Sequence, residues 1–158
     1  MKELIKKKLQ EKLSDYIIDI VEFQSDLTFV IKAENLTIIS KHLRDDVELE
    51  YSLRDILAID RYTNENRFEV VYNFFSIKNK LRIFLKIKIE DAESVPTLVD
   101  VFQSANWYER EVFDMHGIKF YNHPDLRRIY MPEEFQYHPL RKEFPLMGIP
   151  NSISLPRN

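Results

Sequence analysis

The first part of the chain switches between helical and strand-like patterns of hydrophobic residues. Apolar residues recur at helical spacing through residues 2–13 with Lys and Glu between them, which predicts an amphipathic helix. Residues 16–23 and 27–32 are short, rich in β-branched and aromatic residues, and separated by polar residues, so they predict a hairpin. Residues 33–44 return to helical spacing and predict a second helix.

Three strand-like segments follow, at residues 48–62, 67–76 and 80–89. In the last segment, aliphatic residues alternate with mostly charged ones, which is typical of a strand with one buried face. The predicted order is therefore α-β-β-α-β-β-β. Strands grouped with helices on one side favour an α+β fold, a two-layer domain with a mixed sheet, over a doubly wound one.

The pattern changes after the last predicted strand. Residues near 95–105 predict a helix, because Ser94 can cap its start and apolar residues recur at helical spacing. A capping box at Asn106 predicts the start of a second, short helix, which runs through Met115 and has Gly117 as its left-handed stop.

From residue 118 onwards, all hydrophobic periodicity disappears. Structureless segments of this length are uncommon inside compact domains and are usually functional. We therefore divide the chain into an α+β domain at residues 1–105 and a second part at residues 106–158, formed by the short C-terminal helix and an extended Pro-rich tail. Prolines recur in this tail at intervals of five to eight residues, at Pro124, Pro132, Pro139, Pro145 and Pro150.

Composition excludes several classes of protein. The chain has no Cys, which removes disulfide scaffolds, thiolate zinc sites, Cys nucleophiles and Cys-ligated iron–sulfur clusters. With only two Gly, neither a P-loop nor a dinucleotide fingerprint is present. A formal net charge of −3 argues against a nucleic-acid partner. No apolar run approaches the ~20 residues that span a bilayer, so we expect no membrane insertion and a cytosolic location.

Histidines of the C-terminal region are the first candidates for chemistry. His116, His123 and His138 stand near acidic residues. No pair has the i, i+4 spacing of a metal-binding helix, and two of them precede proline, so hydrogen-bonded histidines are favoured over a metal site. No Ser lies in a Gly-flanked elbow, and neighbouring carboxylates point to different sides of a helix. A catalytic pair of carboxylates assembled from distant positions stays open.

The same region also mixes Arg with aromatic residues and Met. These residue types are enriched at the cores of protein–protein interfaces, and a segment without its own periodicity needs a surface on which to bury them. We interpret the region as partner-binding; the alternative is a tail that packs back on its own sheet. The candidate interface residues are Glu109, Arg110, Glu111, Asp114, His123, Asp125, Arg127, Arg128, His138, Arg141 and Lys142.

Adjacent arginines follow the sequence His-Pro-Asp-Leu in this tail. Side chains of neighbouring residues point to opposite faces of an extended chain. We therefore expect one of Arg127 and Arg128 to anchor the tail to its own domain and the other to reach the partner.

Four runs of residues in fixed order carry a resemblance to a known family. They are WYEREVFDMHGI at 107–118, HPDLRRI at 123–129, MPE at 131–133 and HPLRKEFPL at 138–146. Together, residues 105–148 closely resemble the signature of the C subunit of respiratory complex I, also called the 30 kDa subunit of NADH:quinone oxidoreductase. The first hundred residues fit the α+β domain of that family in outline.

The resemblance implies a non-catalytic subunit in the peripheral arm of a proton-translocating NADH:quinone oxidoreductase, at the cytoplasmic side of the membrane. It implies no cofactor in this chain, with FMN and iron–sulfur clusters held by other subunits. The tail is expected to lie across the hydrogenase-like subunit that helps to form the quinone site, beside other peripheral-arm subunits. Membrane-bound nickel–iron hydrogenases and ferredoxin- or deazaflavin-dependent complexes have a similar subunit, so the electron donor stays open. A stand-alone enzyme or binding module is the other class of function.

Overall fold

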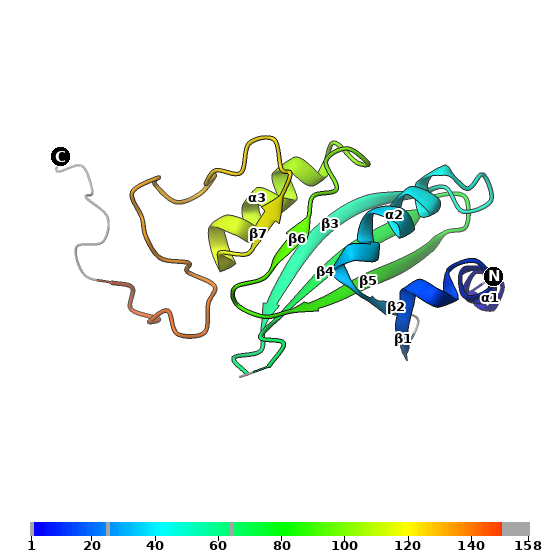
Figure 1. Cartoon of the computed structure of the whole chain (residues 1–158), viewed down its shortest axis with the longest axis horizontal. Coiled ribbons are helices and arrows are strands. Elements are labelled where there is room, and N and C mark those ends of the chain that lie inside the picture. The colour runs from blue at the N-terminus through cyan, green and yellow to red at the C-terminus, as the bar shows by residue number, and fades with distance from the viewer. Residues whose placement is uncertain (1, 25, 64, 150–158) are drawn as a thin grey trace.

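A five-stranded mixed sheet lies at the centre of the fold, which a computed structural model describes for residues 2–24, 26–63 and 65–149 (Figure 1). The strands are arranged in the order β1-β2-β5-β4-β3. Strands β2 and β5 run parallel, whereas the other neighbours are antiparallel, as the prediction of a mixed sheet requires. Their bounds are β1 (Ile17–Phe23), β2 (Asp26–Ile31), β3 (Tyr51–Asp60), β4 (Phe68–Ser76) and β5 (Leu81–Ile89).

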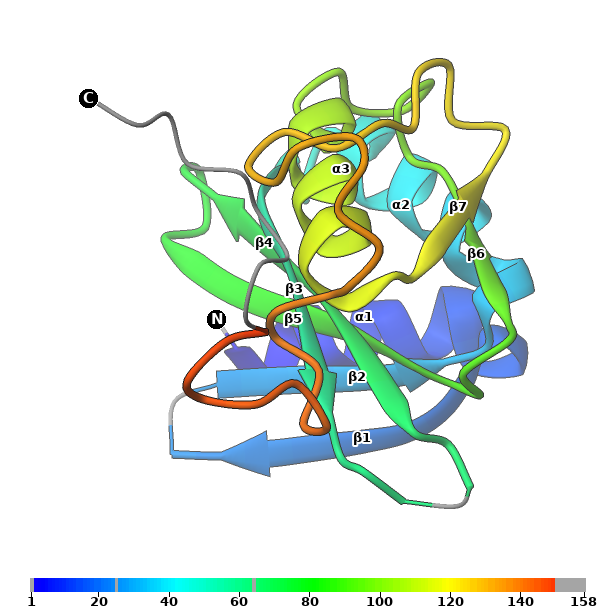
Figure 2. The ribbon, with the colours of Figure 1, turned by 90° about the vertical axis from the view of Figure 1, so that its left-hand side faces the viewer.

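Helices α1 (Lys2–Leu13), α2 (Leu36–Asp45) and α3 (Ala105–His116) bury their apolar residues in one core with the strands (Figures 1 and 2). Alternate residues of β4, such as Tyr72 and Phe74, are fully buried in this core. Since side chains alternate between the two faces of a strand, one face of the sheet packs on the helices. The α-β-β-α-β-β-β order and the two-layer α+β fold are thus confirmed.

The predicted element bounds differ from the observed ones by a few residues. The predicted strand at 48–62 is shorter, because residues 47–49 form a turn before β3. The predicted helix at 33–44 begins with a 3₁₀ turn, Ala33–Asn35, before α2. Another 3₁₀ turn, Ser14–Tyr16, follows α1.

The helix predicted near residues 95–105 is wrong. This segment starts with the short strand β6 (Ser94–Pro96), which pairs in parallel with β7 (Lys119–Tyr121), and continues as turns. The pairing with a strand more than twenty residues away overrides the local helical pattern. Apolar residues at helical spacing, including Leu98, are still buried in the core.

Helix α3 begins one residue before the predicted second helix, at Ala105, and ends one residue after it, at His116. The predicted capping box does not form, since the observed N-cap, Ser104, makes no side-chain capping hydrogen bond. Gly117 follows the last helical residue with a left-handed φ of 77°, which confirms its predicted role.

The core extends beyond the predicted boundary between residues 105 and 106. Val112 of α3, Ile118 and Phe120 of β7 belong to the same buried cluster as the sheet. Whether residues 1–105 fold without the rest stays a prediction. Residues 122–149 contain no helix or strand, and no helix in the described part of the chain is long and apolar enough to cross a membrane.

Candidate functional site

The carboxylate of Asp114, on α3, is the centre of a cluster of contacts with the tail. Its Oδ2 accepts hydrogen bonds from the backbone N–H groups of Ile129, Tyr130 and Met131, at 3.0, 2.7 and 3.0 Å. Its Oδ1 lies 2.6 Å from Nη1 of Arg128. Burial acts to raise the pKa of Asp114, but these donors outweigh it and hold the pKa below its usual value. A carboxylate whose charged form is favoured thus holds residues 128–131 against α3.

A second contact to the same segment comes from Arg110, which is 6% exposed. Its Nε and Nη2 donate to the backbone carbonyls of Arg127 and Arg128, at 3.1 and 3.3 Å. The guanidinium also lies 4.7 Å from the ring centroid of Trp107. Arg110 therefore fixes the backbone of the tail and supports an exposed aromatic ring at the same time.

The tail returns to the end of α3 at residues 138–141. Nδ1 of His138, the N–H of Leu140 and Nε of Arg141 donate to the carbonyls of residues 114–116, at 2.9, 3.0 and 2.6 Å. The last carbonyls of a helix have no partner within the helix. The tail thus completes the C-terminus of α3.

Gly117 makes this return possible. A Cβ atom at this position would lie 2.6 Å from the ring of His138 and 3.0 Å from Nη2 of Arg141. A glycine is therefore required twice, for the left-handed φ and for the close approach of the tail.

Ion pairs fasten the tail to the ends of the strands. Arg67 pairs with Asp60 and Asp91, at 3.0 Å each, and with Glu143 of the tail. Arg141 pairs with Asp91 at 2.8 Å. Residues 141–143 are thereby tied to the ends of β3 and β5 and the start of β4.

Glu109 is a fully buried carboxyl on the inner side of α3. It accepts hydrogen bonds from the hydroxyl of Thr97, at 2.5 Å, and from the N–H of Leu98, at 2.7 Å. Burial outweighs these donors and raises the pKa of Glu109 to about 7. Nε2 of His123 lies 3.9 Å from its Oε2.

Both ring nitrogens of His123 are engaged in hydrogen bonds. Nε2 lies 3.2 Å from the carbonyl oxygen of Asn106 and donates a hydrogen bond to it, because a carbonyl can only accept. Nδ1 accepts a hydrogen bond from the N–H of Asp125 at 3.0 Å. Burial lowers the pKa of His123, so the ring is neutral and holds the tail in place. No group of three His, Asp or Glu side chains within residues 2–24, 26–63 and 65–149 is placed to hold a metal ion.

The predicted interface residues thus fall into two groups. The side chains of one group make contacts within the chain. The tail therefore packs on its own α3 and sheet, which is the alternative that the sequence left open. This group consists of Glu109, Arg110, Asp114, His123, Arg128, His138 and Arg141. The other group has exposed side chains and consists of Glu111, Asp125, Arg127 and Lys142. The backbone N–H of Lys142 nevertheless donates a hydrogen bond to Asp60.

Two exposed aromatic side chains lie beside Glu111 of this second group. Trp107 is 62% exposed and Tyr130 64%, and the hydroxyl of Tyr130 lies 3.4 Å from the carboxylate of Glu111. With Arg127 they form what we call the Trp107 surface, defined by Trp107, Glu111, Arg127 and Tyr130. The sequence shows that these residue types occur in the region, but it does not show which of the side chains are exposed. The spacing of Trp107 and Glu111, four residues apart on one helix, is a signal for a shared face.

Comparisons with known proteins agree on one family. Residues 29–150 match the family described as respiratory-chain NADH dehydrogenase, 30 Kd subunit. The C subunit of NADH-quinone oxidoreductase from Geotalea uraniireducens is 42% identical over 143 residues, which cover 89% of this chain and 86% of the relative. The same subunit from Geobacter sulfurreducens is 45% identical over 144 residues, with 89% and 88% covered.

Two solved structures share the fold. One is Nqo5 of the trypsin-resistant fragment (1-134), with a TM-score of 0.62 and 28% identity, covering 77% of this chain and 98% of that chain. The other is from the membrane-bound sulfane sulfur reductase, an archaeal respiratory membrane complex, with a TM-score of 0.77. At 24% identity, with 92% and 86% covered, the second likeness shows the fold alone.

Proposed function

The chain belongs to the family of the 30 kDa subunit of respiratory-chain NADH dehydrogenase, and on this premise we propose that it is a peripheral-arm subunit of a proton-translocating NADH:quinone oxidoreductase. In this role it carries out no redox step, and the FMN and iron–sulfur clusters belong to other subunits. It packs against the hydrogenase-like subunit that forms the quinone site, contacts other peripheral-arm subunits, and is required for assembly at the cytoplasmic side of the membrane.

The side-chain chemistry supports a chain without its own cofactor. The 158 residues contain no Cys, so no thiolate ligand for a cluster is present in them. The nitrogens of His123 are both used in hydrogen bonds that hold the tail. The charged residues around Asp114 and Arg67 are paired with one another and serve the same purpose.

The observation that carries the proposal is the exposed Trp107 surface, which α3 and the anchored tail form together. Trp, Tyr and Arg are the residue types that dominate binding energy at protein interfaces. Asp114 and Arg110 hold the tail beneath this surface, so little conformational freedom is lost when a partner binds. A preorganised aromatic and Arg surface is suited to a permanent contact between subunits.

The side chains of the two adjacent arginines differ in exposure and in their partners. Arg128 has a side chain that is 10% exposed and binds Asp114. Arg127 has a side chain that is 63% exposed, and its one ion-pair partner among the described residues is Asp125, itself half exposed. We infer that Arg128 anchors the tail and that Arg127 reaches the partner.

Replacement of Arg127 tests this function. In the full set of subunits, Arg127→Ala is expected to reduce the assembled complex and its NADH:quinone activity together, through a loss of about 1–2 kcal/mol in association. The melting temperature of the isolated chain should not change, because an exposed ion pair contributes little to stability. Blue-native gels and activity per assembled complex measure the result.

Lys7→Ala is the matched control, since Lys7 is also exposed and pairs only with a neighbouring residue, Glu11. Normal assembly of both variants would show that the Trp107 surface makes no contact with another subunit. Normal assembly with lost turnover in Arg127→Ala would instead point to a direct part in the redox chemistry.

A second candidate function is the equivalent subunit of a membrane-bound hydrogenase or of a ferredoxin- or deazaflavin-dependent complex. The solved structure from the sulfane sulfur reductase complex shows that a respiratory complex with another name contains a chain of this fold. The higher identity to the two NADH-quinone oxidoreductase subunits favours the NADH form. Assay of the purified complex with NADH and with reduced ferredoxin as alternative donors distinguishes the two.

A further inference from the structure

The face of the sheet that points away from the helical core is exposed. In β5, Ile83, Leu85 and Ile87 are buried in the core, and the residues between them alternate to the other side. There, Lys86 lies between Val71 and Val30 in the strand register. We call this side the open face, and its apolar residues are Val21, Phe23, Val30, Leu57, Ile59, Val71, Phe75 and Phe84.

The apolar residues of the open face differ in exposure. Phe23 is 70% exposed, Leu57 49%, Val21 47% and Ile59 37%, whereas Val71 and Val30 in the middle of the sheet are 9% and 8% exposed. Exposed apolar patches bordered by polar residues mark interaction sites.

Positive charge surrounds this apolar centre. Arg54, Arg82 and Lys88 are exposed, and no carboxylate among the described residues forms an ion pair with them. Arg54 instead lies 5.8 Å from the ring centroid of Phe75. These three cations are available to carboxylates of a partner.

The remaining charges of the open face leave it net positive. Lys86 and Arg61 share the carboxylate of Glu69, at 3.1 and 2.7 Å. Asp55 and Asp19, also on this face, accept hydrogen bonds from the N–H groups of the residues that follow them, and Asp26 is exposed at the start of β2. Five cations therefore face four carboxylates, in a chain whose overall net charge is −3.

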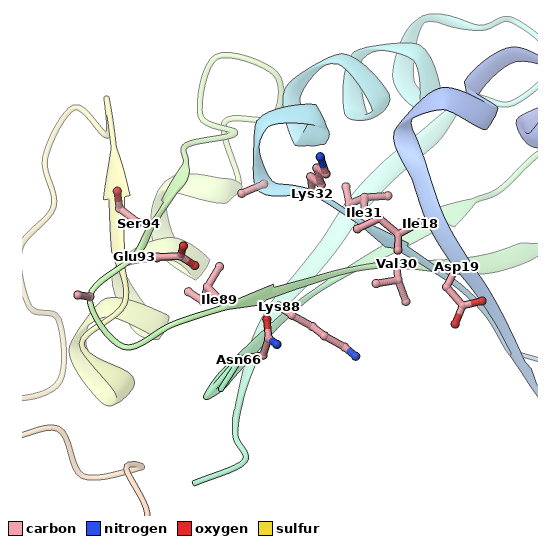
Figure 3. A pocket seen from close by; sticks show the side chains of 12 residues that line it. Ile18, Asp19, Val30, Ile31, Lys32, Asn66, Lys88, Ile89, Glu93 and Ser94 are labelled. Carbon is pink, nitrogen blue, oxygen red and sulfur yellow. The ribbon is translucent and has the colours of Figure 1, made fainter. Parts of the chain in front are cut away.

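A cavity of about 700 Å³ adjoins the open face at one end of the strands. Val30 and Lys88 of the open face belong to its lining. Figure 3 shows Ile18 and Val30 on one side of this space and Ile89 on the other. An apolar side chain of a partner bound to the open face has a place to insert here.

We propose that the open face is a second docking surface, which binds an acidic, amphipathic segment of a neighbouring protein subunit. The segment packs apolar side chains on Leu57, Val71 and Phe84 and directs carboxylates to Arg82 and Lys88. A second copy of this chain is disfavoured, since two positive faces repel each other. Helix α3, which carries Trp107 and Glu111 of the Trp107 surface, lies on the other side of the sheet, so the chain bridges two neighbours (Figure 1).

Charge reversal on the open face tests the proposal in the complete assembly. The double variant Arg82→Glu with Lys88→Glu is expected to lower the amount of chain retained in the complex about tenfold, more strongly at low salt than at high salt. The control, Lys7→Glu with Lys41→Glu, changes the net charge equally at exposed positions on α1 and α2 and should leave assembly unchanged. Unchanged assembly of the open-face variant overturns the proposal.

Cross-linking identifies the occupant independently of any loss of assembly. A photoreactive benzoylphenylalanine in place of Phe84 is expected to form an adduct with an acidic segment of another subunit in the intact complex. An adduct with a second copy of this chain, an adduct with lipid, or no adduct overturns the proposal. Arg127→Ala probes the opposite surface, so failure of one contact is distinguishable from failure of the other.

Discussion

At the scale of single residues, burial moves two pKa values on α3 in opposite directions. Burial raises the pKa of Glu109 to about 7 and lowers the pKa of His116 to about 4. His116 is 7% exposed and packs edge-on against Phe68, with ring centroids 6.4 Å apart. It therefore acts as a neutral aromatic ring of the core at physiological pH.

The raised pKa of Glu109 makes stability depend on pH. Between pH 4.5 and about 7 the folded chain binds the proton of Glu109 while the unfolded chain has released it, so the free energy of unfolding falls as pH rises through this window. A shift of this size corresponds to about 3 kcal/mol. Glu109→Gln removes the titration, so the wild type should lose stability relative to the variant from pH 5 to pH 8.

Urea unfolding of both chains at several pH values measures this difference. Subtraction of the two curves cancels the opposite contribution of His116, whose lowered pKa makes stability fall as pH decreases from about 6.5 towards 4. A difference that stays constant from pH 5 to pH 8 would show that Glu109 keeps an ordinary pKa in the folded chain.

At the scale of elements, the end of α3 and the tail form one unit. The tail supplies hydrogen bonds to the last carbonyls of α3, and Gly117 leaves room for His138. The tail is therefore positioned before any partner is bound. This is the reason why its exposed residues present a defined surface.

Two glycines have similar backbone conformations, so replacing each with Ala distinguishes the cost of a left-handed φ from the cost of a steric clash. Gly117 and Gly148 have φ values of 77° and 72°, but only a Cβ at Gly117 meets neighbouring atoms. We expect Gly148→Ala to cost about 1 kcal/mol and Gly117→Ala about 2–4 kcal/mol, because the second must also displace His138. Urea unfolding measures both costs, and equal costs would show that the tail does not pack closely on Gly117.

At the scale of the whole molecule, the core is shared between the two predicted parts of the chain. Val112, Ile118 and Phe120 are 2–3% exposed and lie in the main cluster. Burial of a large apolar side chain contributes about 1.5–3 kcal/mol, against a total stability of about 5–15 kcal/mol for a typical protein. Removal of α3 and β7 therefore withdraws a large share of the stability.

Two fragments test this sharing. A fragment of residues 1–122 keeps α3 and β7 and should unfold cooperatively, although at a lower temperature because the tail no longer completes the end of α3. A fragment of residues 1–104 should not unfold cooperatively. Thermal unfolding followed by circular dichroism distinguishes them, and a cooperative transition for residues 1–104 would support the boundary predicted at residue 105.

Much of the fold could be predicted from the sequence because its determinants are local. The alternation in residues 81–89 and the helical spacing in residues 2–13 place apolar side chains on one side of an element, whatever lies against it. The left-handed turn at Gly117 likewise depends on backbone sterics at a single residue. The fold class and the order of the first seven elements could therefore be predicted from the sequence. The family signature could be recognised directly, because it is itself a set of residues in fixed order.

Long-range contacts decided what the sequence left open. The segment 95–105 has a helical pattern, yet β6 forms because β7 lies beside it. Alternation predicts that Arg127 and Arg128 point apart, but only the position of Asp114 determines that Arg128 is the inner one. The pairing of Arg67 with Glu143 joins positions 76 residues apart. Such pairs leave no periodic trace along the chain, because they form only where folding brings distant backbone segments together.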